Sequence, residues 1–196
     1  MNFFGKIKKI FGNIISFYKK NSYNITRQVV NQFGIIIFSL VIMITVNVMP
    51  DDLQNSMAVV ASVFSIAFYM FLIFYAMRET GNKDSVRIET GRLAYDPLYG
   101  LKVGFAASVL NYFFALLMLL GLVFSDTLFA IAITVTNYIL LPMYSGVLTS
   151  LLWAIPEASR TVVATVAFFI VPVFAPLASY IGYSYGCRHP RKESRK

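Results

Sequence analysis

Residues 127–156 have the sequence TLFAIAITVTNYILLPMYSGVLTSLLWAIP, and the predicted topology depends on how this uncharged stretch is arranged. Pro142 lies at its middle and Gly146 follows closely. A proline inside a helix removes a hydrogen bond and clashes with the preceding turn. Each half has about 15 residues and is about 22 Å long as a helix, less than the ~30 Å of a hydrocarbon core. Neither half alone therefore crosses a membrane comfortably.

The composition of the whole chain indicates a membrane protein. Of its 196 residues, 58% are hydrophobic and only 13% are charged, whereas soluble domains carry about 25% charged residues. Because each crossing needs about 20 residues, the length allows one bundle of four to six spans. We expect no separate soluble domain.

The basic residues predict the orientation. Sixteen of the seventeen Lys and Arg residues lie in three blocks, at 1–32, 78–102 and 188–196. Basic residues beside membrane spans remain on the cytoplasmic side. Both termini and the middle block are therefore predicted inside, with an even number of crossings between successive blocks. Arg160, in the short link PEASRT, is the one exception, and we place this link outside.

The interval after the middle block does not fit this rule if every apolar stretch crosses once. Spans at 102–124, 127–156 and 161–186 would leave the basic tail outside. A re-entrant helical hairpin at 127–156, which enters and leaves on one side, restores the even number. Its uncharged turn also suits a tip within the membrane. The alternative is a single tilted helix kinked at Pro142, with the tail outside.

The predicted fold is an all-α integral membrane bundle over residues 33–186. It has four full transmembrane helices plus the re-entrant hairpin, and it ends in a basic cytoplasmic tail at 187–196. The first two helices form a hairpin whose outer loop contains no Lys or Arg. Gly182 and Gly186 have the spacing at which helices pack closely, and we expect this contact within the bundle. The four full spans are predicted at 33–49, 57–77, 102–124 and 161–186.

The segment 1–32 is predicted to lie along the cytoplasmic face. Within residues 2–20, aromatic and aliphatic side chains recur at helical spacing, with lysines largely on the other side. This pattern is typical of an amphipathic helix in the membrane interface. Lys6 and Lys9 are therefore candidates for contact with lipid or a partner.

The cytoplasmic loop 78–101 is the only polar connection of any size, and nine charges lie within residues 78–102. Apolar and charged residues alternate on both sides of Thr90-Gly91, which predicts a short β-hairpin. Arg87 and Arg92 are candidates for contact with a cytoplasmic or membrane protein partner, or with the lipid bilayer.

The broken stretch is also the best candidate for a binding site. Irregular backbone at membrane depth is tolerated only where protein buries it or where it lines a wet cavity, and transporters hold substrates at such breaks. The alternative is that these polar groups only hydrogen-bond to neighbouring helices. The candidate ligand-binding residues are Asn137, Tyr138, Pro142, Tyr144, Ser145 and Thr149.

Other chemistry is not indicated. No ionisable Asp, Glu, Lys, Arg or His falls within the hydrocarbon part of a predicted span, although such residues mark proton and ion paths. Cys187 and His189 are the single cysteine and histidine. We therefore predict no catalytic residue, no metal site, no cofactor and no enzyme activity. Nucleic-acid binding is not predicted either, because the cations flank apolar spans.

Three short motifs carry a resemblance. NQFG at 31–34 precedes the first span, RLAYDPLYGLKVG at 92–104 enters the third, and GYSYGCR at 182–188 closes the last. This layout resembles small multi-spanning membrane proteins of Gram-positive bacteria. The resemblance implies a bacterial cell (cytoplasmic) membrane and an inside tail, and it transfers no activity.

Two functions fit these patterns. The first is a small transport-related or ligand-binding membrane component that uses the broken helix around Pro142. The second is a non-transporting membrane scaffold or regulator that acts through its amphipathic N-terminus and charged cytoplasmic loop.

Overall fold

A computed structural model describes residues 3–189, and every regular element in this range is helical. The longest segment without a helix is the connection at 90–98. The elements are α1 (Phe3–Asn47), α2 (Asp51–Glu89), α3 (Tyr99–Ala107), α4 (Val109–Phe124), α5 (Asp126–Thr134), the π-turn η1 (Val135–Leu140), the 3₁₀ turn η2 (Pro142–Tyr144), α6 (Ser145–Trp153), α7 (Glu157–Ile170), the 3₁₀ turn η3 (Val171–Val173) and α8 (Phe174–Arg188).

Several of these helices are long and apolar enough to cross a membrane. Three qualify alone, at Gly12–Asn47, Asp51–Glu89 and Glu157–Arg188. Two bent pairs raise the number to five: α3 with α4, bent by 57°, and the two halves of residues 126–153, bent by 89°. For residues 3–189, an all-helical fold with three to five candidate membrane spans is therefore confirmed. Four full spans with a re-entrant hairpin stay a prediction.

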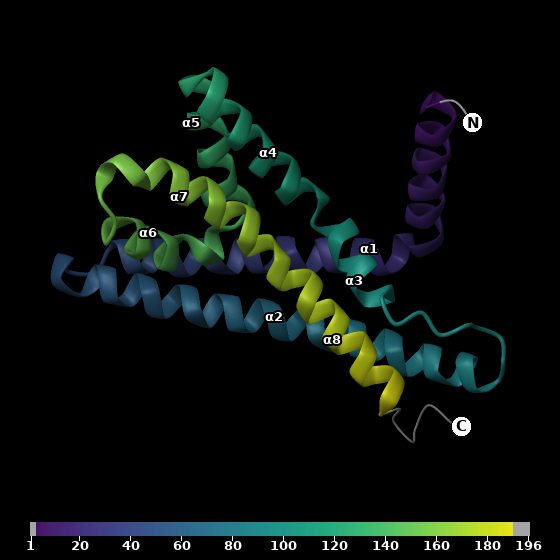
Figure 1. Ribbon diagram of the computed structural model, residues 1–196. Coiled ribbons are helices and arrows are strands. Elements are labelled where there is room, and N and C mark those ends of the chain that lie inside the picture. The colour runs from purple at the N-terminus through teal and green to yellow at the C-terminus, as the bar shows by residue number, and fades with distance from the viewer. Residues whose placement is uncertain (1–2, 190–196) are drawn as a thin grey trace.

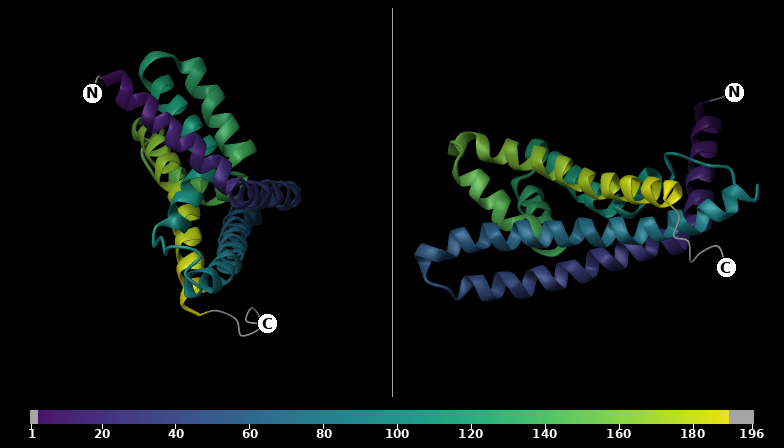
Figure 2. Two further views of the ribbon diagram at one scale, coloured as in Figure 1. Left: turned by 90° about the vertical axis from the view of Figure 1, so that its right-hand side faces the viewer. Right: turned by 90° about the horizontal axis from the view of Figure 1, so that it is seen from below.

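The chain ends and three of the turns between helices are grouped at opposite ends of the bundle. Helices α1 and α2 form a long antiparallel pair, and the α7–α8 helix crosses it (Figure 1). The connection 90–98 and the described ends of the chain lie toward the right of Figure 1. The α1–α2, α4–α5 and α6–α7 turns lie toward the left. The right-hand view of Figure 2 shows the same separation from below.

The contact between α2 and α8 is backbone to backbone. A Cβ added at Gly182 would overlap the carbonyl of Phe74, and one at Gly186 would overlap the carbonyl of Arg78. From the other side, a Cβ at Gly81 would overlap the carbonyl of Tyr183. The glycine spacing in α8 therefore gives the close helix packing within the bundle that the sequence predicted.

Burial in this bundle differs from that of a soluble protein, because large apolar side chains lie on the surface as well as in the core. Small polar residues are inside: Ser62, Ser65 and Ser179 are each at most 1% exposed. Large apolar side chains face outward, with Ile37 64% and Val123 66% exposed. Water would disfavour such an apolar surface, whereas lipid would solvate it. The distribution is therefore consistent with the membrane location predicted from composition.

The predicted β-hairpin after residue 85 is wrong. Helix α2 continues to Glu89, and an irregular turn containing Gly91, at φ 71°, follows it. The apolar-charged alternation covers too few residues to outweigh helix propagation, which adds one hydrogen bond per residue. An isolated two-stranded hairpin is marginal in water. Contacts of this last part of α2 with α8 also favour the helix, because Asp84 and Ser85 are buried.

The N-terminal segment is helical, and a kink separates it from the rest of α1. Helix α1 bends at Asn21, where φ is −112° and ψ is 15°, and its first part turns away from the bundle (Figures 1 and 2). Lys9 is exposed. The side chain of Lys6 and the tail 190–196 lie outside the described residues. Placement of this helix at a membrane surface stays a prediction.

The glycine contact predicts a stability effect. Gly186→Ala should lower the free energy of unfolding by about 1–3 kcal/mol, because the methyl group overpacks a backbone contact. The matched control is Gly34→Ala, since no atom lies within 4 Å of a Cβ at that position. It should leave stability unchanged or raise it by up to about 1 kcal/mol through helix propensity. Thermal unfolding in detergent micelles checks both, and equal shifts would contradict the packing.

Candidate functional site

The helix break at Pro142 rearranges the backbone hydrogen bonds around it. Upstream, the N–H of Leu141 donates to the carbonyl of Thr136 at 2.8 Å, the spacing of a π-turn. Downstream, the N–H of Tyr144 donates to the carbonyl of Leu141 at 3.0 Å. Pro142 has no N–H to donate. The carbonyl of Leu140 lacks its α-helical donor, because the N–H of Tyr144 donates to Leu141 instead.

Gln32 of α1 supplies a donor for this carbonyl. Its side-chain amide donates to the Leu140 carbonyl at 3.3 Å and to Oδ1 of Asn111 at 3.0 Å. The Asn111 amide donates back to Gln32 Oε1 at 3.5 Å. Both side chains are buried. Because a buried carbonyl without a partner is costly, this amide pair stabilises the break and ties it to α1 and α4.

The segment after the break packs directly on α2. The N–H of Gly146 donates to Ser62 Oγ at 2.9 Å. A Cβ at Gly146 would overlap the carbonyl of Ala58, so only glycine allows this approach. The break is therefore held on two sides, by Gln32 and by α2.

A cavity of about 320 Å³ lies between this segment and the end of the α1–α2 hairpin. Among the residues that the structure describes, no charged side chain lines it. Carboxamides and hydroxyls line one part, and Leu40, Met43 and Ile44 line another. The polar lining residues are Asn47, Gln54, Asn55, Asn137, Tyr138, Ser145, Thr149 and Ser150.

The structure brings five of the six predicted residues to this cavity: Asn137, Tyr138, Pro142, Ser145 and Thr149. Tyr144 is not among the lining residues, and its side chain is 5% exposed within the hydrophobic core. Whether the five bind a ligand stays a prediction.

The sequence analysis missed the opposite wall, formed by Asn47, Gln54 and Asn55. These residues flank the α1–α2 turn at 48–50, and their polarity was visible. What the sequence did not show is that this turn lies beside the broken helix.

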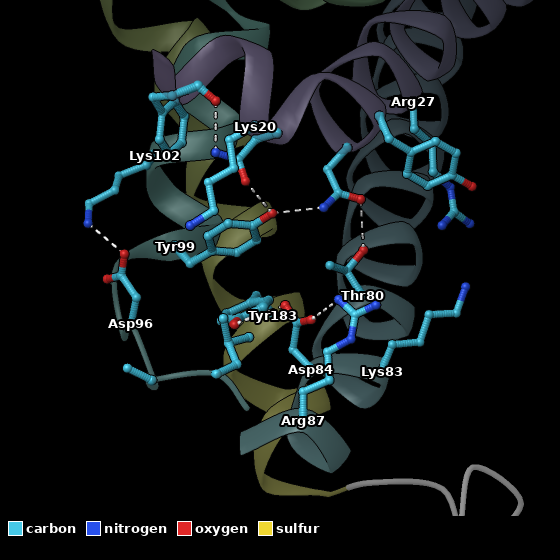
Figure 3. Close-up of a pocket in the computed structure, with 16 residues that line it drawn as sticks. Lys20, Arg27, Thr80, Lys83, Asp84, Arg87, Asp96, Tyr99, Lys102 and Tyr183 are labelled. Carbon is cyan, nitrogen blue, oxygen red and sulfur yellow. Dashed lines mark hydrogen bonds and ion pairs between the residues drawn. The ribbon is translucent and has the colours of Figure 1, made fainter. Parts of the chain in front are cut away.

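A second cavity, of about 520 Å³, lies where α1, α2, α3 and α8 meet near the bend of α1 (Figure 3). Five basic and two acidic side chains line it. Arg87, a predicted partner or lipid contact, is one of them, whereas Lys9 and Arg92 line neither cavity. The basic lining residues are Lys20, Arg27, Lys83, Arg87 and Lys102.

The Tyr99 hydroxyl lies at the centre of a hydrogen-bond network in this second cavity (Figure 3). It donates to Asn21 Oδ1 at 3.0 Å and accepts from Asn24 Nδ2 at 2.8 Å. Thr80 Oγ1 in turn donates to Asn24 Oδ1 at 3.3 Å. The network joins the bend of α1 to α2 and α3, and so it fixes the shape of the cavity.

The acidic groups around the second cavity are paired. Asp96 contacts Lys102 at 2.6 Å and Asp84 contacts Arg87 at 3.5 Å. Tyr183 also donates to Asp84, at 3.3 Å. In the polar last turns of α2, beyond the predicted span at 57–77, burial raises the pKa of Asp84, although Arg87 partly offsets this.

Glu79 lies just behind the lining and pairs with two of the cations. Its carboxylate contacts Arg27 at 2.6 Å and Lys83 at 2.8 Å. Hydrogen bonds from Lys83 and Arg27 lower the pKa of this carboxyl. Lys20, by contrast, has no acidic partner among the residues that the structure describes.

Comparison with known proteins was made by family, by sequence and by structure. No family model, curated protein or solved structure matches this chain. Within residues 3–189, no group of three or more His, Cys, Asp or Glu residues is placed to hold a metal ion. The two cavities are therefore the basis of the functional proposals.

The amide pair at the break predicts a second stability effect. Gln32→Met keeps the length of the side chain but leaves the Leu140 carbonyl and Asn111 without partners, and it should cost about 1–3 kcal/mol. Gln54→Met is the matched control: Gln54 makes only one exposed bond, to the Asn47 carbonyl at 3.2 Å. Thermal unfolding of both variants in micelles is the measurement. A smaller loss for Gln32→Met than for Gln54→Met would refute the role of Gln32.

Proposed function

We propose that the protein is a membrane component that binds a neutral or amphipathic molecule in the uncharged cavity beside Pro142. The observation that supports this most directly is the composition of the cavity. Polar groups from three separate segments, the end of α1, the start of α2 and the broken helix, line one space without a charge. A transport-related role is the form of this function that a broken helix favours.

The lining determines which ligands fit. Each carboxamide offers hydrogen-bond donors and an acceptor, and each hydroxyl can donate or accept a hydrogen bond. They therefore suit hydroxyl, amide or ester groups. A charged ligand would lose hydration without gaining a counter-charge, which is costly. The apolar wall of Leu40, Met43 and Ile44 suits a short hydrocarbon portion.

We also propose that residues 127–156 form a re-entrant hairpin and that the cavity opens to the outside. The 89° bend and the grouping of the α1–α2, α4–α5 and α6–α7 turns toward the left of Figure 1 support this. Arg160, the basic exception, has a local role in the α6–α7 link. It donates to the Ile155 carbonyl at 3.1 Å and lies 4.9 Å from the centre of the Trp153 ring. Its charge therefore need not place the link inside.

The alternative function, a scaffold or regulator in the bacterial cytoplasmic membrane, would use the N-terminal part of α1. Ile14 and Ile15 are 46% and 53% exposed there, beside exposed lysines. An apolar strip beside lysines favours contact with lipid or with another protein. Under this alternative, removal of residues 2–20 would abolish activity, and changes at 137–150 would alter only folding.

Two probes with the same chain length test the binding proposal. In nanodiscs, 1-decanoylglycerol, which is neutral, should raise the melting temperature of the protein, whereas decanoate should not. Asn137→Leu should weaken binding of the neutral probe about three- to tenfold, because it removes one or two hydrogen bonds. Asn31→Leu, at a half-buried residue of α1 outside the cavity, should leave binding unchanged.

Calorimetric titration of the same samples gives the dissociation constants. Equal affinity for the two probes, or equal weakening by the two substitutions, would contradict binding in the uncharged cavity. If no probe bound and removal of residues 2–20 abolished association with a partner, the scaffold function would be favoured instead.

A further inference from the structure

The second cavity has the opposite chemistry to the one beside Pro142, and we propose that it binds a phosphate-bearing ligand. The phosphate belongs either to the headgroup of an anionic lipid or to a free phosphate. This site is independent of the uncharged cavity, because α1 and α2 contribute different ends to the two, and it does not rest on the function proposed above.

Positive charge from three helices converges on this cavity. Lys20 and Arg27 come from α1, Lys83 and Arg87 from α2, and Lys102 from α3. Two acidic side chains of the described part of the chain, Asp84 and Asp96, line the same space. The net charge of the lining side chains is therefore positive. A concave surface of positive charge concentrates anions.

The pairing of these charges leaves a place for an anion. Acidic partners orient four of the five cations, through the contacts of Glu79, Asp84 and Asp96. Lys20 is the exception among the described residues, and its side chain is exposed. Figure 3 shows Lys20 above the Tyr99 ring, with Lys102 and Asp96 on one side of it and Thr80 and Lys83 on the other. An oxyanion in front of Tyr99 would meet Lys20 without displacing an ion pair.

Phosphate suits these groups better than other anions of similar charge. Its several oxygens accept charge-assisted bonds from lysine and arginine at once. The volume of about 520 Å³ is typical of a small-molecule site, and inorganic phosphate alone would leave much of it empty. Phe17, Tyr23 and Leu93 in the lining suit an ester with a less polar portion.

The position of the cavity also fits a lipid headgroup. Helices α1 and α2 are long enough to span a bilayer, and the cavity lies where the polar turns of α2 follow the predicted span at 57–77. Juxtamembrane lysines and arginines at this level attract anionic headgroups. An acidic peptide would need an open surface, whereas this site is concave.

Native mass spectrometry of the full chain in dodecyl maltoside tests the site. The probes are dioleoyl-phosphatidylglycerol and dioleoyl-phosphatidylcholine, which differ in net charge, and inorganic phosphate at 10 mM serves as competitor. The site variant is Lys20→Gln. Lys9→Gln is its matched control, because it removes one exposed charge from the same helix outside the cavity.

The proposal predicts a preference for phosphatidylglycerol and about fivefold weaker binding of it in Lys20→Gln, the effect of one juxtamembrane charge. Lys9→Gln should bind as the unaltered protein does. Because Lys20 has no ion pair, its substitution should leave the melting temperature unchanged. Displacement of the lipid by inorganic phosphate would assign the site to free phosphate, and retention of the lipid would assign it to the headgroup.

Three results would overturn the proposal. The first is equal binding of the two lipids together with no displacement of either lipid by inorganic phosphate. The second is equal loss of phosphatidylglycerol in Lys20→Gln and Lys9→Gln, which would indicate a diffuse surface charge. Displacement of the lipid by a short polyglutamate peptide but not by phosphate would also overturn it, because it would indicate an acidic protein partner.

Discussion

The backbone contact between α2 and α8 is the constraint on which the rest of the structure depends. Gly81, Gly182 and Gly186 allow the two helices to touch where any side chain would separate them. On α2 the contact covers 74–82, next to the second cavity. Toward one end, Ala58 and Ser62 receive the segment after the break. Toward the other, Thr80 and Asp84 line the basic cavity. One helix thus contributes to both candidate sites.

A break inside a membrane bundle is stable only if its freed backbone groups find partners. Here Gln32 bonds the Leu140 carbonyl and Ser62 bonds the Gly146 N–H. These contacts place irregular backbone beside a polar cavity instead of beside lipid. The two cavities differ in the chemistry of the residues that line them. One has no charge and suits a neutral ligand, whereas the other gathers cations from α1, α2 and α3 and suits an anion.

Sequence predicted the features that depend on local chemistry. A proline such as Pro142 lacks an N–H in any fold. Apolar runs long enough to cross a membrane can be read directly from the sequence. Features that depend on helix pairing were missed: Asn47 and Gln54 line one cavity with Asn137 only because the α1–α2 turn lies beside the broken helix. The predicted β-hairpin failed because a short alternation of apolar and charged residues also fits a helix. Likewise, Lys20 looked like part of an amphipathic surface, and only the bend at Asn21 places it over Tyr99.

The central claim is that residues 127–156 enter and leave the membrane on one side, so that the α6–α7 link is outside and the tail inside. Single cysteines at Ser159 and Ser194, introduced in a Cys187→Ser background, test this with a membrane-impermeant maleimide on intact cells. We predict labelling at position 159 and protection at position 194 until the cells are opened. Protection at 159 together with labelling at 194 would contradict the claim, because the broken stretch would then be a single kinked span.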